Sequence, residues 1–155
     1  MNPEFKKFIE DNFLVPSKAL DLGAGSGGDV EGLKNLGWET EGVDLKTGTD
    51  LEEEYLSEKG PFDLVYSNYV LHYLKNKKAL IKSAHDNLKT EGWFFFHDLI
   101  RSELTTEMYL SQEEIEEMIK AEGFEILESN IFSFFDDKPD HRHYHDVVEI
   151  HAKKK

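Results

Sequence analysis

The residues best suited to bind a ligand form a glycine-dense turn. Gly23, Gly25 and Gly27 follow the largely apolar residues 18–22 and precede a helical pattern at residues 28–36. Glycine lets the backbone bend sharply and approach a ligand closely, because it has no side chain. The first turn of the following helix points its free amides at the same place. We therefore expect a ligand to lie against this turn.

Acidic residues flank the turn. Asp21 comes directly before it, and Asp44 ends the next strand-like segment, residues 38–43, at about the distance that a ribose-binding carboxylate requires. Asp29 falls in the first turn of the helix, with no Lys or Arg near the loop. A carboxylate there opposes a pyrophosphate but not a cationic cofactor without phosphate. This favours such a cofactor, while a nucleotide-binding domain that uses NAD stays an alternative.

Histidines are the candidate groups for proton transfer. His97 follows a later apolar segment, and His143 and His145 share one face of the last expected strand. Histidine titrates near neutral pH without special tuning, so these three are the candidate general bases. With His141 and nearby acids they could also hold a divalent metal. A polar turn with solvated histidines is the simpler interpretation, and we predict no metal site.

The elements that must position these residues follow an α/β pattern. Phe5, Phe8 and Ile9 recur at helical spacing, which predicts an N-terminal helix at residues 3–12 packed on the sheet edge. The capping-box pattern of residues 111–114 starts a later helix that stops at Gly123. The sequence further predicts a helix at residues 77–88 and strands at residues 18–22, 38–43, 62–67, 92–96, 124–134 and 143–152.

The chain is short after the second expected strand. Asp44 and Asp50 are separated by fewer residues than the ten or so that a crossover helix with its loops requires. We therefore expect this helix to be missing and the third strand to be short or absent. The Glu-rich residues 51–59 are expected to form a short exposed helix.

Three segments resemble class I S-adenosylmethionine-dependent methyltransferases. Residues 21–27, Asp-Leu-Gly-Ala-Gly-Ser-Gly, are similar to the Asp-x-Gly-x-Gly-x-Gly signature of that family. Residues 61–74 resemble its fourth strand and following turn, and residues 87–98 resemble the turn and fifth strand that come next. The histidines near the C-terminus resemble those of small bacterial members, including tellurite-resistance-type and related small-molecule methyltransferases. Three motifs in the right order are more specific than any one of them.

The resemblance implies a Rossmann-like, doubly wound α/β sheet, mostly parallel with an antiparallel last strand. A single domain of residues 1–155 would consist of the N-terminal helix in residues 1–15 and the core in residues 16–155. The cofactor would be S-adenosylmethionine, with Asp44 on the ribose hydroxyls, Asp50 and Leu51 beside the adenine, and His72 either on the cofactor side or capping a helix. The implied cofactor-binding residues are Asp21, Gly23, Ala24, Gly25, Ser26, Gly27, Asp44, Leu45, Asp50, Leu51, Ser67, Asn68, Tyr69 and His72.

Methyl transfer to an unidentified small molecule or protein side chain is the function that this resemblance implies. A methyl group on a sulfonium is already activated, so the protein has to align donor and acceptor and exclude water. His97, His143 and His145 are the candidate bases where the acceptor must lose a proton. A module that binds the cofactor or a partner without catalysis stays the alternative.

Composition restricts the partners. The 155 residues include 18 basic and 32 acidic residues, a net charge of −14, and no cysteine. So acidic a surface repels phosphate backbones, and we expect no nucleic-acid partner. The sequence shows no signal peptide and no apolar run long enough to span a bilayer, which predicts a cytoplasmic protein without a membrane partner. A homodimer is possible, because a second subunit could close an otherwise open crevice.

Overall fold

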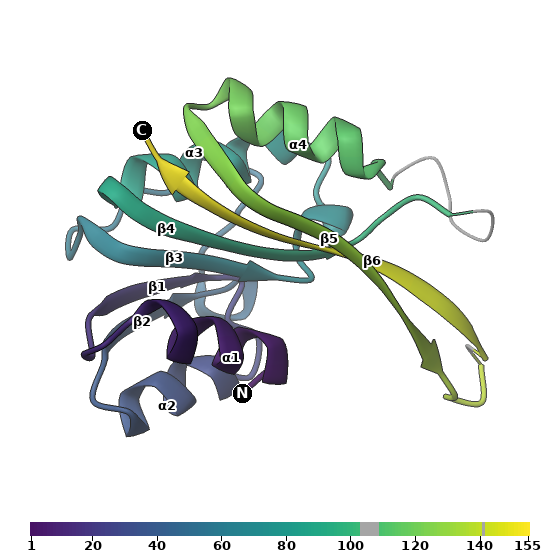
Figure 1. The fold of residues 1–155 in the computed structure, drawn as a ribbon, viewed down its shortest axis with the longest axis horizontal. Helices are drawn as coiled ribbons and strands as arrows, with labels where there is room; N and C mark the ends of the chain where they lie inside the picture. The colour runs from purple at the N-terminus through teal and green to yellow at the C-terminus, as the bar shows by residue number, and fades with distance from the viewer. Residues whose placement is uncertain (103–108, 141) are drawn as a thin grey trace.

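The structure, a computed structural model, describes residues 1–102, 109–140 and 142–155 (Figure 1). Within these ranges six strands form one sheet in the order β2-β1-β3-β4-β6-β5. The strands β1 to β4 are parallel, whereas β6 is antiparallel to both β4 and β5. The expected Rossmann-like sheet with an antiparallel last strand is confirmed. The strands are β1 (Lys18–Leu22), β2 (Glu39–Val43), β3 (Phe62–Asn68), β4 (Leu88–Leu99), β5 (Phe124–Asp136) and β6 (His143–Lys154).

Helices cover both faces of the sheet (Figure 1). On one face lie α1 (Pro3–Asn12) and α2 (Gly28–Asn35), and on the other lie α3 (Lys77–Asn87) and α4 (Gln112–Ala121). Two short 3₁₀ turns, η1 (Leu45–Thr47) and η2 (Leu71–Tyr73), follow β2 and β3. None of the described helices combines the length and apolar character needed to cross a membrane.

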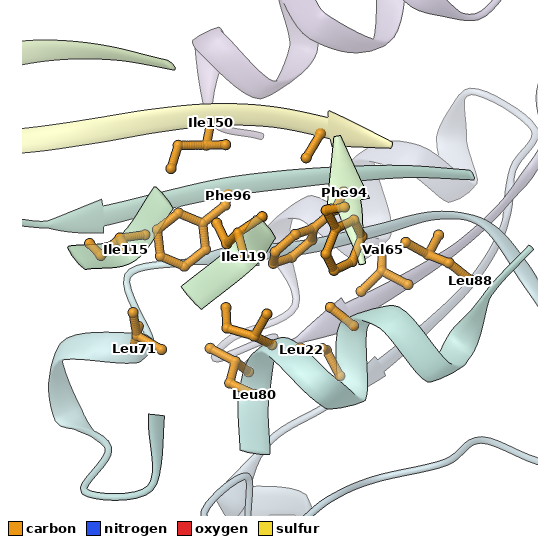
Figure 2. Packing of buried hydrophobic residues seen from close by; sticks show 14 of the residues in the cluster. Leu22, Val65, Leu71, Leu80, Leu88, Phe94, Phe96, Ile115, Ile119 and Ile150 are labelled. Atoms are coloured by element: carbon orange, nitrogen blue, oxygen red, sulfur yellow. The ribbon is translucent and has the colours of Figure 1, made fainter. Parts of the chain in front are cut away.

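Alternating side chains along the strands build two core layers. In β3, Leu64 and Tyr66 pack with residues of α1 and α2, whereas Val65 packs with residues of α3 and α4. Figure 2 shows this second layer, where Phe96 of β4 and Ile119 of α4 meet in the same cluster. The strands are therefore buried on both faces, as is usual for a parallel sheet.

Helix α1 packs across the middle of the sheet, and the expected position at its edge is wrong. Phe5 is fully buried, with its ring centroid 4.3 Å from that of Tyr66 and 5.0 Å from that of Phe95. The ring of Phe8 meets that of Trp93 edge-on at 5.3 Å. These partners belong to β3 and β4, the two central strands. Helical periodicity identifies the buried face of a helix but not the strands that it covers.

No crossover helix joins β2 to β3. Residues 44–61 are all described, and their regular structure is limited to η1. The missing helix and the absent third strand are confirmed, and β2 lies at the edge of the sheet. The short helix expected at residues 51–59 is wrong, because this segment consists of turns and irregular backbone.

Side-chain hydrogen bonds hold this irregular segment in place. The carboxylate of Glu41 on β2 accepts from the hydroxyl of Ser57 at 2.7 Å and from the hydroxyl of Tyr55. At the end of α3, Asn87 donates to the Tyr55 carbonyl at 2.8 Å and accepts from the Ser57 amide at 2.9 Å. Ser83 accepts from the Tyr55 amide at 2.9 Å. These anchors come from distant parts of the chain, so a local composition rich in Glu could not reveal them.

Strands β5 and β6 continue beyond the other strands as a two-stranded ribbon (Figure 1). The ladder between β4 and β6 ends where Leu99 pairs with Val147. The ladder between β5 and β6 goes on until Asp136 pairs with His143. The ribbon therefore carries the end of β5 and the start of β6 past the carboxyl edge of the parallel strands.

Candidate functional site

A cavity of about 540 Å³ lies at the carboxyl edge of the parallel strands. Its wall comes from the glycine turn after β1, the ends of β2 and β3 with the following 3₁₀ turns, and residues 49–52. Open α/β sheets bind their ligands at this edge. Eight of the predicted cofactor contacts line the cavity, namely Gly23, Gly25, Asp44, Leu45, Asp50, Leu51, Asn68 and Tyr69. Sequence reasoning missed five further lining residues, Thr49, Glu52, Val70, Tyr73 and Leu74.

Gly23 is the most constrained position of the glycine turn. Its φ is +99°, and a Cβ atom there would lie 2.3 Å from Cγ2 of Val70. The amides of Gly23 and Ala24 both donate to the carbonyl of Val43 at 2.9 Å. The turn is thus fixed to the end of β2, and only glycine fits at residue 23.

Asp44 connects the glycine turn to η1. One carboxylate oxygen accepts from the amide of Lys46 at 2.9 Å and the other from the amide of Gly25 at 3.0 Å. The backbone hydrogen bond from Lys46, with that from Gly25, lowers the pKa of the Asp44 carboxyl. Its ionised oxygens keep further lone pairs, so they can accept hydrogen bonds from the hydroxyls of a ligand in the cavity.

The turn after β3 contains a strained residue. Tyr69 has a φ of +60°, a value that non-glycine residues rarely adopt, and its amide donates to the carbonyl of His97 at 2.9 Å. Burial raises the pKa of Tyr69 to about 12, so its hydroxyl is neutral at physiological pH. Strain of this kind concentrates at ligand sites. Here Tyr69 and Val70 both line the cavity, and Val70 lies directly against Gly23.

The N-terminus of α1 is anchored to the same region by polar contacts. Asn2 caps the helix, and its backbone amide donates to one carboxylate oxygen of Asp29 at 2.9 Å. The other Asp29 oxygen accepts from the side-chain amide of Asn68 at 2.9 Å. Asp29 therefore ties α1, α2 and β3 together beside the cavity.

His97 lies beneath α1 rather than in the cavity wall. Its side chain is fully buried, with Nδ1 3.3 Å from Nδ2 of Asn2 and Nε2 2.7 Å from a carboxylate oxygen of Glu149. The second oxygen of Glu149 lies 2.6 Å from Nε2 of His151. These partners stand far from residue 97 in the sequence, so the pattern of the strand did not predict them.

The Glu149 network predicts a pH-dependent stability. Burial acts to raise the pKa of Glu149, but hydrogen bonds with His151 and His97 outweigh it and lower the pKa from 4.5 to about 2. A carboxyl with a lowered pKa stabilises the fold while it is ionised. This contribution is complete above pH 4.5 and is lost as the pH falls toward 2.

Urea unfolding across this pH range checks the prediction. The free energy of unfolding of the wild type should fall between pH 4.5 and pH 2, and the fall should be smaller in Glu149→Gln. Glu128→Gln is the matched control, because Glu128 is exposed and makes only a longer contact of 3.4 Å with His151. Equal pH dependence in the wild type and in Glu149→Gln would contradict this account.

The backbones of His143 and His145 lie on the ribbon. Nε2 of His145 is 3.5 Å from a carboxylate oxygen of Asp136, and His145 is not part of the cavity wall. The backbone of His143 pairs with Asp136, while its side chain lies outside the described part of the structure. His141 also lies outside the described residues.

The remaining predicted contacts lie next to the cavity without lining it. Asp21 is buried, and burial with the nearby Asp29 raises its pKa well above the ordinary value. The hydroxyl of Ser67 is buried and has no hydrogen-bond partner among the described residues. Ala24, Ser26 and Gly27 shape the glycine turn, but their atoms are not in the wall.

His72 is paired with Asp98 at the end of β4. Nδ1 of His72 makes a hydrogen bond to one Asp98 oxygen, and the His72 amide donates to the other at 3.1 Å. Asp98 is fully buried and also accepts from the amide of Leu99 at 2.7 Å. The His72 ring lies 4.0 Å from that of Tyr73 and meets that of Tyr109 edge-on at 5.4 Å, centroid to centroid. The sequence indicated His72 but not its partner.

Comparison with known proteins identifies relatives. Residues 2–129 match a family model described as a methyltransferase domain. The ubiquinone biosynthesis O-methyltransferase of Burkholderia ambifaria is 26% identical over an alignment that covers 65% of this chain and 57% of that protein. The chain thus spans little more than half the length of this curated relative.

Solved structures share the fold. TehB from Haemophilus influenzae superposes with a TM-score of 0.80 at 17% identity, covering 100% of this chain and 63% of that chain. A second neighbour is the Burkholderia thailandensis 1,6-didemethyltoxoflavin-N1-methyltransferase with bound 1,6-didemethyltoxoflavin and S-adenosylhomocysteine. Its TM-score is 0.74 at 19% identity, covering 99% of this chain and 78% of that chain.

Proposed function

We propose, since this chain belongs to the methyltransferase domain family, that it transfers the methyl group of S-adenosylmethionine to a small-molecule acceptor. The observation that carries the proposal is the cavity at the carboxyl edge, which is lined by the glycine turn and by Asp44. The cavity of about 540 Å³ is of the size that small-molecule sites in proteins have.

The residues present fit the cofactor. Asp44 offers carboxylate oxygens to the two ribose hydroxyls, and Leu51 and Leu74 offer apolar surface for the adenine. Gly25 also lines the cavity, and a Cβ atom there would meet nothing within 4 Å, so this glycine leaves the backbone open to close approach. The acids Asp44, Asp50 and Glu52 line the cavity, and no Lys or Arg among the described residues does. Such a wall suits a cationic sulfonium better than the pyrophosphate of NAD.

The role of the protein residues is to bind the cofactor and to align it with the methyl acceptor. When bound, S-adenosylmethionine supplies a methyl group that is already activated for displacement. Asp44 and the glycine turn hold the donor side, while Tyr69 and Val70 close the wall toward the end of β3. Alignment of donor and acceptor lowers the barrier of such a reaction, and exclusion of water prevents side reactions.

The names of the relatives refer to small molecules, and this favours a small-molecule acceptor over a protein side chain. One neighbour is a toxoflavin-type N-methyltransferase with its small-molecule ligand bound, and the curated relatives are O-methyltransferases of ubiquinone biosynthesis. By similarity to these relatives, the methyl acceptor of this chain is proposed to be a small molecule.

Calorimetric titration tests the cofactor assignment. We expect S-adenosylhomocysteine to bind the wild type with micromolar affinity and NAD to show no binding. Asp44→Asn should weaken the affinity about tenfold or more, because it removes a charged acceptor for hydroxyl groups. Asp140→Asn removes the same charge from an exposed turn and should leave the affinity unchanged. Binding of NAD in place of S-adenosylhomocysteine would contradict the proposal.

A further inference from the structure

The His72–Asp98 pair has the arrangement of a proton acceptor with its positioning carboxylate. Asp98 is fully buried and accepts three hydrogen bonds, from the backbone amides of His72 and Leu99 and from Nδ1 of His72. Because a carboxyl oxygen of Asp98 accepts the hydrogen bond at Nδ1, the ring proton of His72 is on that nitrogen and the lone pair is on Nε2.

Nε2 of His72 is free to accept a proton. The hydrogen bonds found for His72 with other described residues involve its amide and Nδ1, and its side chain is 6% exposed. The hydrogen bond between Nδ1 and Asp98 thus orients the ring without using the second nitrogen. His97 differs, because both of its ring nitrogens face partners beneath α1.

The pair is next to the cavity. His72 lies in η2 next to the cavity-lining residue Tyr73 without itself lining the cavity, and Asp98 is one residue before the end of β4. The rings of Tyr73 and Tyr109 flank His72 at centroid distances of 4.0 and 5.4 Å. A flat aromatic acceptor could pack against these rings.

Other groups near His72 do not replace it as a base. Burial raises the pKa of Tyr69 to about 12 and also raises the pKa of Tyr109. Lys77 interacts electrostatically with Asp98. Its ammonium group, however, donates to the carbonyls of Leu71 and Leu74 at 2.9 and 2.7 Å. Tyr73 is largely exposed. Asp98 itself is occupied by its three donors.

We propose that His72, positioned by Asp98, is the general base of this site and that the methyl acceptor is a neutral phenol. This proposal rests on the proposed function. Nε2 of His72 takes the hydroxyl proton while the phenol oxygen forms a bond to the methyl carbon. The bond between that carbon and the sulfonium sulfur breaks, and its electron pair stays on sulfur. The products are the methyl ether, S-adenosylhomocysteine and protonated His72, which releases its proton to solvent.

Two probe acceptors separate this role from a structural one. At mildly alkaline pH phenol keeps its proton, with a pKa of about 10 like the tyrosine side chain, whereas 4-nitrophenol is largely ionised and needs no base. We expect His72→Asn to lower kcat with phenol by roughly 10²- to 10⁴-fold. With 4-nitrophenol the same variant should keep most of the wild-type rate. Transfer is measured from S-adenosylmethionine labelled in its methyl group.

Asp98 variants test the positioning role. Asp98→Asn removes the negative charge beside His72, so the rise of kcat with pH for phenol should move to lower pH and the maximal rate should fall. Asp98→Glu keeps the charge and should restore part of the rate. Thermal unfolding of each variant confirms that it is folded. A pH profile that is the same in Asp98→Asn as in the wild type would overturn the role of Asp98.

The outcomes distinguish this inference from the proposed function. If the wild type binds S-adenosylhomocysteine but methylates neither probe, a phenol acceptor is wrong while the cofactor assignment stands. If His72→Asn slows both probes equally, His72 is not the base. If S-adenosylhomocysteine does not bind, the proposed function itself fails.

Discussion

Replacing Gly23 by alanine is expected to abolish binding of S-adenosylhomocysteine and to destabilise the fold. The new Cβ would lie 2.3 Å from Cγ2 of Val70, in a backbone whose φ is +99°. Val70 stands in the cavity wall, so the clash must displace either the glycine turn or the turn after β3. Strain and overpacking together should cost about 2–5 kcal/mol of unfolding free energy.

Gly48→Ala is the matched control for this prediction. Gly48 has the same φ of +99°, but a Cβ there meets nothing within 4 Å. This variant carries the backbone strain without the clash, so it should lose about 1 kcal/mol and keep its affinity for S-adenosylhomocysteine. Urea unfolding and calorimetric titration of both variants give the comparison. Equal affinities in the two variants would show that close packing at Gly23 does not shape the cavity.

Truncating Phe5 to alanine should have the largest effect on stability outside the cavity. Its ring is fully buried between α1 and the central strands, against Tyr66 and Phe95. Removing a buried Phe ring costs about 3–5 kcal/mol in transfer and cavity terms. Because Asn2 precedes the same helix and contacts Asp29, loosening α1 should also increase amide exchange at the start of α2.

Phe135→Ala is the control for the Phe5 variant. Phe135 is 51% exposed on the ribbon and packs with the ring of Tyr144 at 5.2 Å. Its truncation should change the unfolding free energy by about 1 kcal/mol or less. The two variants are compared by urea unfolding and hydrogen exchange. A loss of stability at Phe5 no larger than that at Phe135 would mean that α1 does not contribute to the core.

Local patterns were sufficient to predict the elements that carry the cavity. The strand, glycine turn and helix around Gly23 are consecutive in the chain, and the number of residues between Asp44 and Asp50 excluded a crossover helix. Eight of the cofactor contacts that the family resemblance implied line the cavity. Six of these residues lie at or just after the end of a parallel strand, whereas Asp50 and Leu51 lie in the irregular segment between β2 and β3.

Contacts between distant segments could not be predicted in this way. The irregular segment at residues 51–59 depends on Glu41 and Asn87, which lie on β2 and α3. The partners of His97 and His72 come from β6 and from the end of β4. A single sequence shows which residues can form such pairs, but it does not show which of them meet.

A crystal structure of the protein with S-adenosylhomocysteine tests the central claim most directly. We predict that the ligand lies in the cavity of about 540 Å³, with its ribose hydroxyls on Asp44 and its amino-acid portion against the turn at Gly23. The adenine should contact Leu51. A ligand bound elsewhere, for example in the groove between α1 and β5 lined by Phe8 and Trp93, would contradict the account.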